Sequence, residues 1–248
     1  GNMFSNFDGP PSASDLTSRY DDDEVPTGDS DDFVNAVDDA AGSSRFFDGL
    51  SDSDRDSLAD SLQSVYDNDD DDLDPETRQR AAVLAADVTL RGADSGETIN
   101  NVANVLTSSD GVENFDDPAE LMDQIIPDSA KDDPAAIQKV LDDMVTAADA
   151  YDALGSSLPD EDEDGTPEGP EGTNMAEVAQ KAAVAMVVRN IVEQDPGGSE
   201  GLADRIDSGQ VDDVSYENPL ESEQDKDGDA FDKILSAGGL GGVFDSDE

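Results

Sequence analysis

TNMAEVAQKAAVAMVVRNIV, residues 173 to 192, is the stretch that decides the fold. Apolar residues occupy most faces of a helix drawn through it, whereas a surface helix carries them on one stripe. Thr173 is the expected N-cap, and Pro196, Gly197 and Gly198 mark the end of the helix. The segment is too short and too charged to span a membrane. We therefore predict a buried helix at the centre of a helical bundle.

Helical periodicity predicts further helices along the chain. They cover residues 31–41, 51–66, 75–91, 95–106, 118–126, 134–154, 199–208 and 229–235. Three of them begin at an Asp-Pro pair, at Asp74, Asp117 and Asp133, where Asp accepts hydrogen bonds from free amides and Pro has none to satisfy. No alternating run is long enough to predict a strand. We expect a mainly α protein, an irregular bundle of about seven to nine helices with disordered acidic tails and loops.

The pattern divides the chain into five regions. We expect a flexible N-terminal arm over residues 1–28, a helical region over 29–155 and an acidic linker over 156–172. Residues 173–208 hold the central apolar helix and a short helix that packs on the same core. Residues 209–248 are expected to form a flexible C-terminal region.

Acidic residues dominate the composition. The chain has 64 Asp and Glu against 13 Lys and Arg, which gives a net charge of -51, and most of the acid is Asp. Leu, Ile, Val and Phe make up about 20% of the residues, the level at which a highly charged chain borders on disorder. This composition resembles that of proteins from extremely halophilic archaea and their viruses. The resemblance implies folding in concentrated KCl or NaCl, in the cytoplasm or in a virion, because salt screens the repulsion between carboxylates.

Several classes of function are excluded or disfavoured by what the chain lacks. It contains no His and no Cys, which removes the commonest general base and the ordinary zinc ligands. No cluster of Lys and Arg offers a surface for direct nucleic-acid binding. Residues 197–201 fit G-x-S-x-G, but Ser199 follows a helix and is interpreted as a helix N-cap. We therefore predict that the protein is not an enzyme.

One acidic segment has the spacing of a calcium-binding loop. Residues 160–171, DEDEDGTPEGPE, match D-x-D-x-D-G-x5-E, which brings carboxylates around one hard cation. The candidate metal ligands are Asp160, Asp162, Asp164 and Glu171. The segment resembles an EF-hand loop, but Pro167 and Pro170 depart from that pattern and prevent the exit helix from starting inside the loop. A flexible acidic linker is the competing interpretation.

Aromatic residues in the terminal segments are the candidates for contacts with other proteins. Phe4, Phe7 and Tyr20 lie in the N-terminal arm, and Phe244 lies near the C-terminus. We predict a non-enzymatic structural or interaction subunit of a larger assembly, such as a virion component, with protein partners or further copies of itself. The alternatives are a Ca²⁺-binding module and an acidic protein that mimics DNA or binds basic proteins.

Overall fold

The computed structural model describes residues 15–16, 18–20, 23–91, 97–98, 100–101, 104–105, 116–159 and 166–242, with the backbone alone at 44 and 226–229. Within these ranges the chain forms helices and no strand, so the predicted mainly α class is confirmed. The α-helices are α2 (Thr27–Ala41), α3 (Ser44–Asp48), α4 (Asp52–Tyr66), α5 (Pro75–Leu90), α7 (Pro118–Ile125), α8 (Pro134–Ser157), α9 (Met175–Gln194), α10 (Gly198–Ser208) and α11 (Pro219–Ala237). A short 3-10 helix, η3 (Val211–Asp213), lies between α10 and α11.

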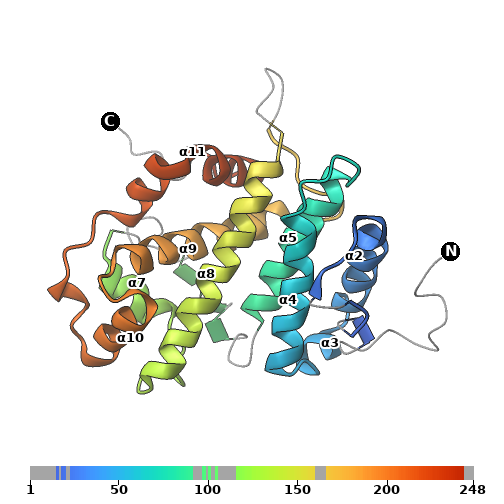
Figure 1. Cartoon of the computed structure of the whole chain (residues 1–248). Helices are drawn as coiled ribbons and strands as arrows, with labels where there is room; N and C mark the ends of the chain where they lie inside the picture. The colour runs from blue at the N-terminus through green and yellow to red at the C-terminus, as the bar shows by residue number, and fades with distance from the viewer. Residues whose placement is uncertain are drawn as a thin grey trace.

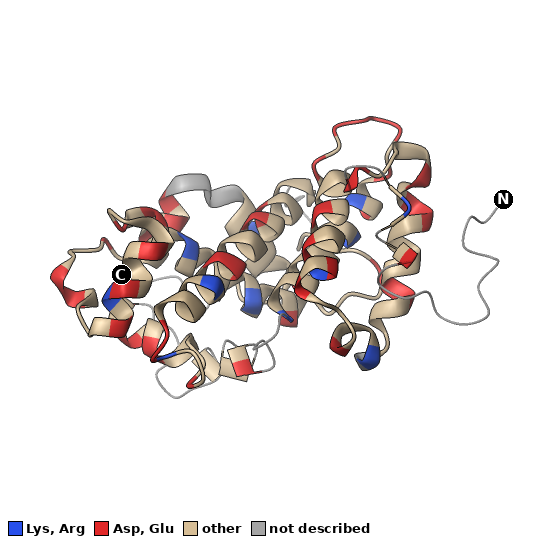
Figure 2. Ribbon diagram, turned by 60° about the horizontal axis from the view of Figure 1, so that its bottom comes forward, with Lys and Arg blue, Asp and Glu red and all other residues tan. Residues whose placement is uncertain are grey.

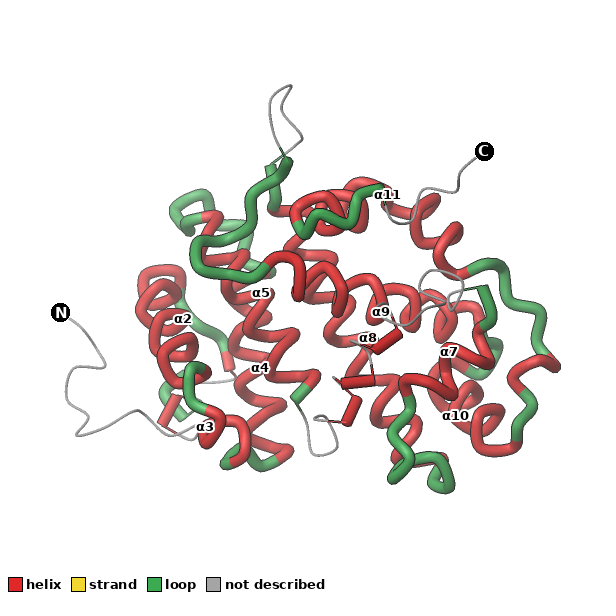
Figure 3. Tube along the Cα trace, turned by 180° about the vertical axis from the view of Figure 1, so that it is seen from behind, coloured by secondary structure: helices red, strands yellow, loops and turns green. Residues whose placement is uncertain are grey.

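The helices form two groups that meet along α5 and α8 (Figure 1). Helices α2, α3 and α4 lie on the α5 side, and α7, α9, α10 and α11 lie on the α8 side. The same division is visible from behind in Figure 3. The most extensive packing joins α5 to α8, α4 to α5, α11 to α9 and α8 to α9. A single hydrophobic cluster runs through both groups, so the bundle has one continuous core.

Helix α9 is buried as predicted, but it lies at the centre of its own group and not of the whole bundle, because α2 and α4 pack on α5 and not on α9. Every residue from Val178 to Val192 except Gln180 is buried. The run includes three polar residues, Lys181, Arg189 and Asn190. The N-cap is Asn174, one residue after the predicted Thr173, and its side chain accepts a hydrogen bond from the N–H of Glu177. The helix is therefore wrapped on all sides by α8, α10 and α11.

Helix α5 is buried almost as completely, which the sequence pattern did not reveal. Its buried residues are Thr77, Gln79, Ala81, Ala82, Val83, Leu84, Ala85, Ala86, Val88, Thr89 and Leu90. Four of these are alanines, whose small side chains let α4 and α8 approach from two sides. Each half of the bundle thus has its own central helix.

The Asp-Pro pairs begin helices as predicted. Asp74, Asp117 and Asp133 each accept hydrogen bonds from amides in the first turn of α5, α7 and α8. Ser51 caps α4 in the same way by accepting from the N–H of Asp54. Asn218 followed by Pro219 uses this arrangement a fourth time, at the start of α11.

Three predictions about helix ends are wrong. The helix predicted over 31–41 begins four residues earlier, at Thr27. Helix α8 does not end at Gly155 but continues to Ser157, and a Cβ at Gly155 would collide with the backbone of Ala230 in α11. Glycine is thus required there by the close approach of two helices and not by a turn. Ser199 is not an N-cap, because α10 starts one residue earlier with Gly197 at the cap position.

The C-terminal part of the chain is more ordered than predicted. Residues 209–248 were expected to be flexible apart from a short helix at 229–235, whereas α11 spans Pro219–Ala237 and packs on α8 and α9. Leu220, Phe231, Ile234 and Leu235 of α11 are buried. The buried face of α11 was not predicted because it includes Glu223, an acidic residue in an acidic stretch of sequence.

Candidate functional site

The proposed calcium ligands fall largely outside the described residues. Asp160, Asp162 and Asp164 are not among them, and only Glu171 can be placed. Glu171 is exposed, and its backbone N–H donates to Oε1 of Glu76 in α5 at 3.3 Å. Within the described ranges, no group of three acidic side chains is arranged to hold a metal ion. The Ca²⁺ loop therefore stays a prediction.

Of the four aromatic residues predicted to contact other proteins, Phe4, Phe7 and Phe244 also lie outside the described part of the chain. Tyr20 is described, and its ring meets Phe33 of α2 edge-on, with the ring centroids 5.5 Å apart. Its hydroxyl is enclosed and has no hydrogen-bond partner among the described residues. Burial, followed by the nearby charge of Asp29, raises the pKa of this hydroxyl. The ring of Tyr20 thus attaches its segment to the core of the same chain.

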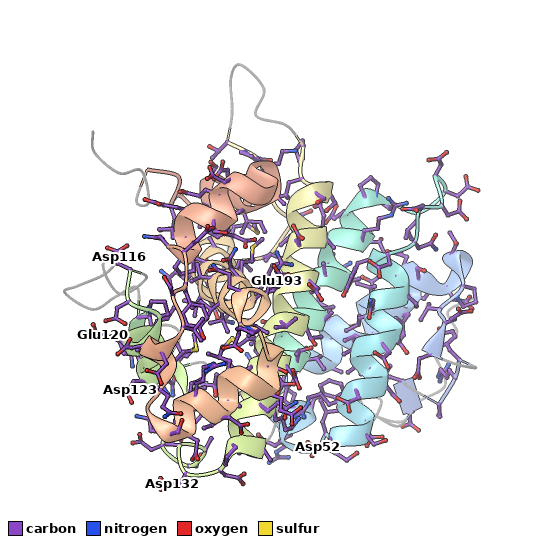
Figure 4. The ribbon with its side chains drawn as sticks, turned by 60° about the vertical axis from the view of Figure 1, so that its left-hand side comes forward. Asp52, Asp116, Glu120, Asp123, Asp132 and Glu193 are labelled. Atoms are coloured by element: carbon purple, nitrogen blue, oxygen red, sulfur yellow. The ribbon has the colours of Figure 1, made fainter. Side chains whose placement is uncertain are left out.

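The exterior of the molecule is acidic on every side. Asp and Glu are spread widely over the helices in Figure 2, whereas Lys and Arg are few. Figure 4 shows Asp116, Glu120, Asp123 and Asp132 along the outer edge around α7. The arrangement provides a uniformly anionic surface.

The basic residues are used mainly inside the fold. Among the described residues, ion pairs are made by Arg55, Arg80, Lys131, Lys139, Lys181, Arg189 and Arg205. Arg91 lies over the ring of Phe47, 4.4 Å from its centroid, which is a cation–π contact. Seven of the described basic residues therefore have a carboxylate partner within the same chain.

The most deeply buried of these ion pairs joins α8, α9 and α11, and we call it the Arg189 cluster. Arg189 donates to Oε1 of Glu223 at 2.9 Å, to Asp149 at 3.0 Å and to Asp152 at 3.3 Å. The Glu223 side chain is only 3% exposed, and its second oxygen accepts from Asn190 at 3.1 Å. The neighbouring carboxylates raise the pKa of Arg189, although burial opposes this. The cluster fastens α11 to the central helix.

A cavity of about 260 Å³ lies between α5, α9 and the segment that precedes α9. Lys181 reaches it from α9 and contacts Glu177 at 2.8 Å and Asp87 of α5 at 3.5 Å. Burial raises the pKa of Asp87, while the hydrogen bond from Lys181 lowers the pKa of Glu177. Arg80, on the same wall, is paired with Asp38 at 3.0 Å. Both basic groups of this cavity already have carboxylate partners within the chain.

The charges of Lys181 and Arg189 are among those that argue against a membrane span, but their partners on other helices were not predicted. A charged residue inside an otherwise apolar helix signals a buried partner on another helix, because an unpaired buried charge is very costly. Among the described residues, no helix is both long enough and apolar enough to cross a membrane. Comparisons with protein-family models, with curated proteins and with solved structures found no match for this chain.

Proposed function

We propose that this chain is a non-enzymatic structural and interaction subunit of a larger protein assembly, and that it works in concentrated salt in a halophile or in a virion of a virus that infects one. The observation that supports the proposal is the internal use of basic residues. Lys181 and Arg189 lie inside the bundle on carboxylate partners, which leaves an outer surface of unmatched Asp and Glu. Such a surface keeps a protein hydrated and unaggregated in brine.

The described body has few apolar groups left to bind a partner. Its apolar side chains form the continuous core, and those packed at the edge of the core, such as Met175, Ile206 and Leu240, are already partly buried. Association through this body would bring carboxylates together. We therefore assign the contacts between subunits to the aromatic residues of the terminal segments, Phe4, Phe7 and Phe244, whose rings bury a large apolar area per residue.

Light scattering during size-exclusion chromatography in about 2 M KCl tests this assignment, because surface repulsion is screened at that ionic strength. We expect a mass well above the 26.0 kDa of one chain, and a fall to that mass in a variant with Phe4, Phe7 and Phe244 replaced by Ala. Replacement of the neighbouring Asp8 and Asp245 by Asn is the matched control and should leave the mass unchanged. A wild-type mass of 26.0 kDa at every concentration contradicts self-assembly.

A further inference from the structure

Helix α2 covers the central helix α5 from the outside of the bundle. It lies at one end of the molecule and packs on α5 and, less extensively, on α3 and α4 (Figure 1). Phe33, Val34 and Val37 of α2 are completely buried. Helix α11 covers the other central helix, α9, on the far side of the bundle. The two covering helices are held in place by different means.

Helix α2 carries acid and no base. Its charged residues are all Asp: Asp29, Asp31, Asp32, Asp38 and Asp39. Its first turn lies beside the acidic loop 69–72, because the hydroxyl of Thr27 donates to Asp70 at 3.1 Å and accepts from Asn68 at 2.9 Å. Helix α5 beneath it has two acidic and two basic residues and thus no net positive charge. In dilute salt, like charges therefore repel α2 from its surroundings.

The ion pair that joins α2 to α5 is exposed to solvent. Arg80 of α5 contacts Asp38 at 3.0 Å, and the Asp38 side chain is 56% exposed. The carboxylate of Glu223 in the ion pair that fastens α11 to α9 is only 3% exposed. An exposed pair contributes little to stability, whereas a buried carboxylate cannot leave its cation without a large cost. One exposed pair is therefore too weak to offset the repulsion that acts on α2.

The helical structure of α2 also has little local support. No side chain accepts a hydrogen bond from its first turn, where Pro26 is the cap residue. The other described helices of 15 residues or more, α4, α5, α8, α9 and α11, all have a side-chain N-cap. Asp38 and Asp39 lie in the last turn of α2, where the helix dipole disfavours negative charge. Helix α2 therefore depends on its packing against α5.

We propose that α2 is a salt-dependent cover, which leaves α5 as the ionic strength falls while the core around α9 is still folded. In concentrated salt the repulsion is screened, and burial of Phe33, Val34 and Val37 keeps α2 in place. At lower salt the repulsion returns and acts most strongly on α2. Its release uncovers these side chains and the part of α5 beneath them, so the protein gains an apolar surface that responds to ionic strength. The proposal rests on the salt-dependent folding proposed above.

Hydrogen exchange of the intact chain, followed by mass spectrometry from about 2 M to about 0.05 M KCl, tests the order of these events. We expect residues 27–41 to lose protection at a higher KCl concentration than residues 175–194. At an intermediate concentration, exchange in α2 should be at least about tenfold faster than in 2 M KCl, with exchange in α9 unchanged. Loss of protection in both helices at the same concentration contradicts the cover but leaves salt-dependent folding intact. Protection of both helices at 0.05 M KCl contradicts both proposals.

A pair of charge-reversal variants tests whether the charge of α2 itself is the cause. Asp39→Lys removes an exposed carboxylate from the last turn of α2 and places a base there, so α2 should keep its protection to a lower KCl concentration. Asp142→Lys makes the same change in net charge at an exposed position of α8 and should leave the transition of α2 unchanged. Protection of α9 in each sample shows that the variant is folded. Equal shifts in the two variants, or no shift in either, overturn the proposal.

Discussion

Helix α8 separates two regions that differ in how far their carboxylates are paired with basic side chains. Toward α9 and α11, Asp149 and Asp152 of α8 share Arg189 with Glu223, and the charges are matched. Toward α4 and α5, Asp143 of the same helix faces Asp56 and Asp60 across a cavity with little positive charge. The chain has 13 basic residues for 64 acidic ones, so few carboxylates can be paired. The position of each basic side chain therefore decides at which contacts between helices the carboxylates are neutralised. The first junction holds α11 against α9, whereas in the second Asp143 has only Lys139 nearby, at 3.8 Å.

The largest effect is expected at the matched junction. Arg189→Ala leaves Glu223, whose side chain is 3% exposed, as a buried charge without its cation. We expect the free energy of unfolding to fall by about 3–5 kcal/mol, measured by urea denaturation in concentrated KCl.

A double variant is the control for this prediction. Arg189→Met together with Glu223→Met removes both charges and keeps apolar volume in the junction. It should recover most of the lost stability, because a buried ion pair often contributes little over apolar packing. If the single variant loses less than about 1 kcal/mol, the cluster does not fasten α11 as described.

An intermediate effect is expected for Lys181, whose side chain is 11% exposed between Asp87 and Glu177. Lys181→Met should lower the free energy of unfolding by about 2 kcal/mol, because Asp87 loses its cation in a site where burial already raises its pKa. Lys139→Met is the control, since Lys139 is 45% exposed and should change stability by about 0.5 kcal/mol at most. Equal effects in the two variants would mean that burial of the cation does not matter.

The smallest effect on stability is expected at Asp143, where α8 meets α4 and α5, and it is a gain instead of a loss. The pKa of Asp143 is about 6 in the folded protein, above its ordinary value of 3.8. Between these values the folded state holds a proton that the unfolded state has released, so this group favours folding more as the pH falls from 7 toward 4. Asp143→Asn should therefore raise stability at pH 7 by about 1 kcal/mol, after allowance for screening.

The pH dependence identifies the cause of that gain. The advantage of Asp143→Asn should shrink as the pH falls through 6 and vanish below about 4, where the wild-type carboxyl is protonated in both states. Thermal unfolding of wild type and variant at several pH values in the same KCl concentration measures the difference. A gain that does not change with pH would have a cause other than the charge of Asp143.

Local features of the fold could be predicted from the sequence because their causes are local. The Asp-Pro starts at Asp74, Asp117 and Asp133 depend on the side chain and backbone of two adjacent residues. The burial of α9 follows from apolar residues on every face. The burial of α5 was missed because its alanines contribute little to hydrophobic periodicity, and helix packing alone decides whether they face solvent.

The sites could not be predicted because their parts are brought together only by folding. In the sequence, Glu223 is one of several acidic residues between 217 and 229. No neighbouring residue indicates that it pairs with Arg189, which lies 34 positions earlier. Asn218-Pro219 carried a usable signal for the start of α11, since it repeats the Asp-Pro arrangement with another capping residue. The cavity that Asp143 lines is formed by α4, α5 and α8 together, and no spacing within one helix indicates it.

The central claim is that dissolved salt keeps this acidic bundle folded, and circular dichroism during a KCl titration tests it most directly. At about 2 M KCl the Debye length is only a few ångströms, so we expect full helical signal, with cooperative loss of that signal as KCl is lowered to about 0.05 M. Full helicity retained at the low concentration would show that the net charge of -51 does not endanger the fold, and would contradict the account.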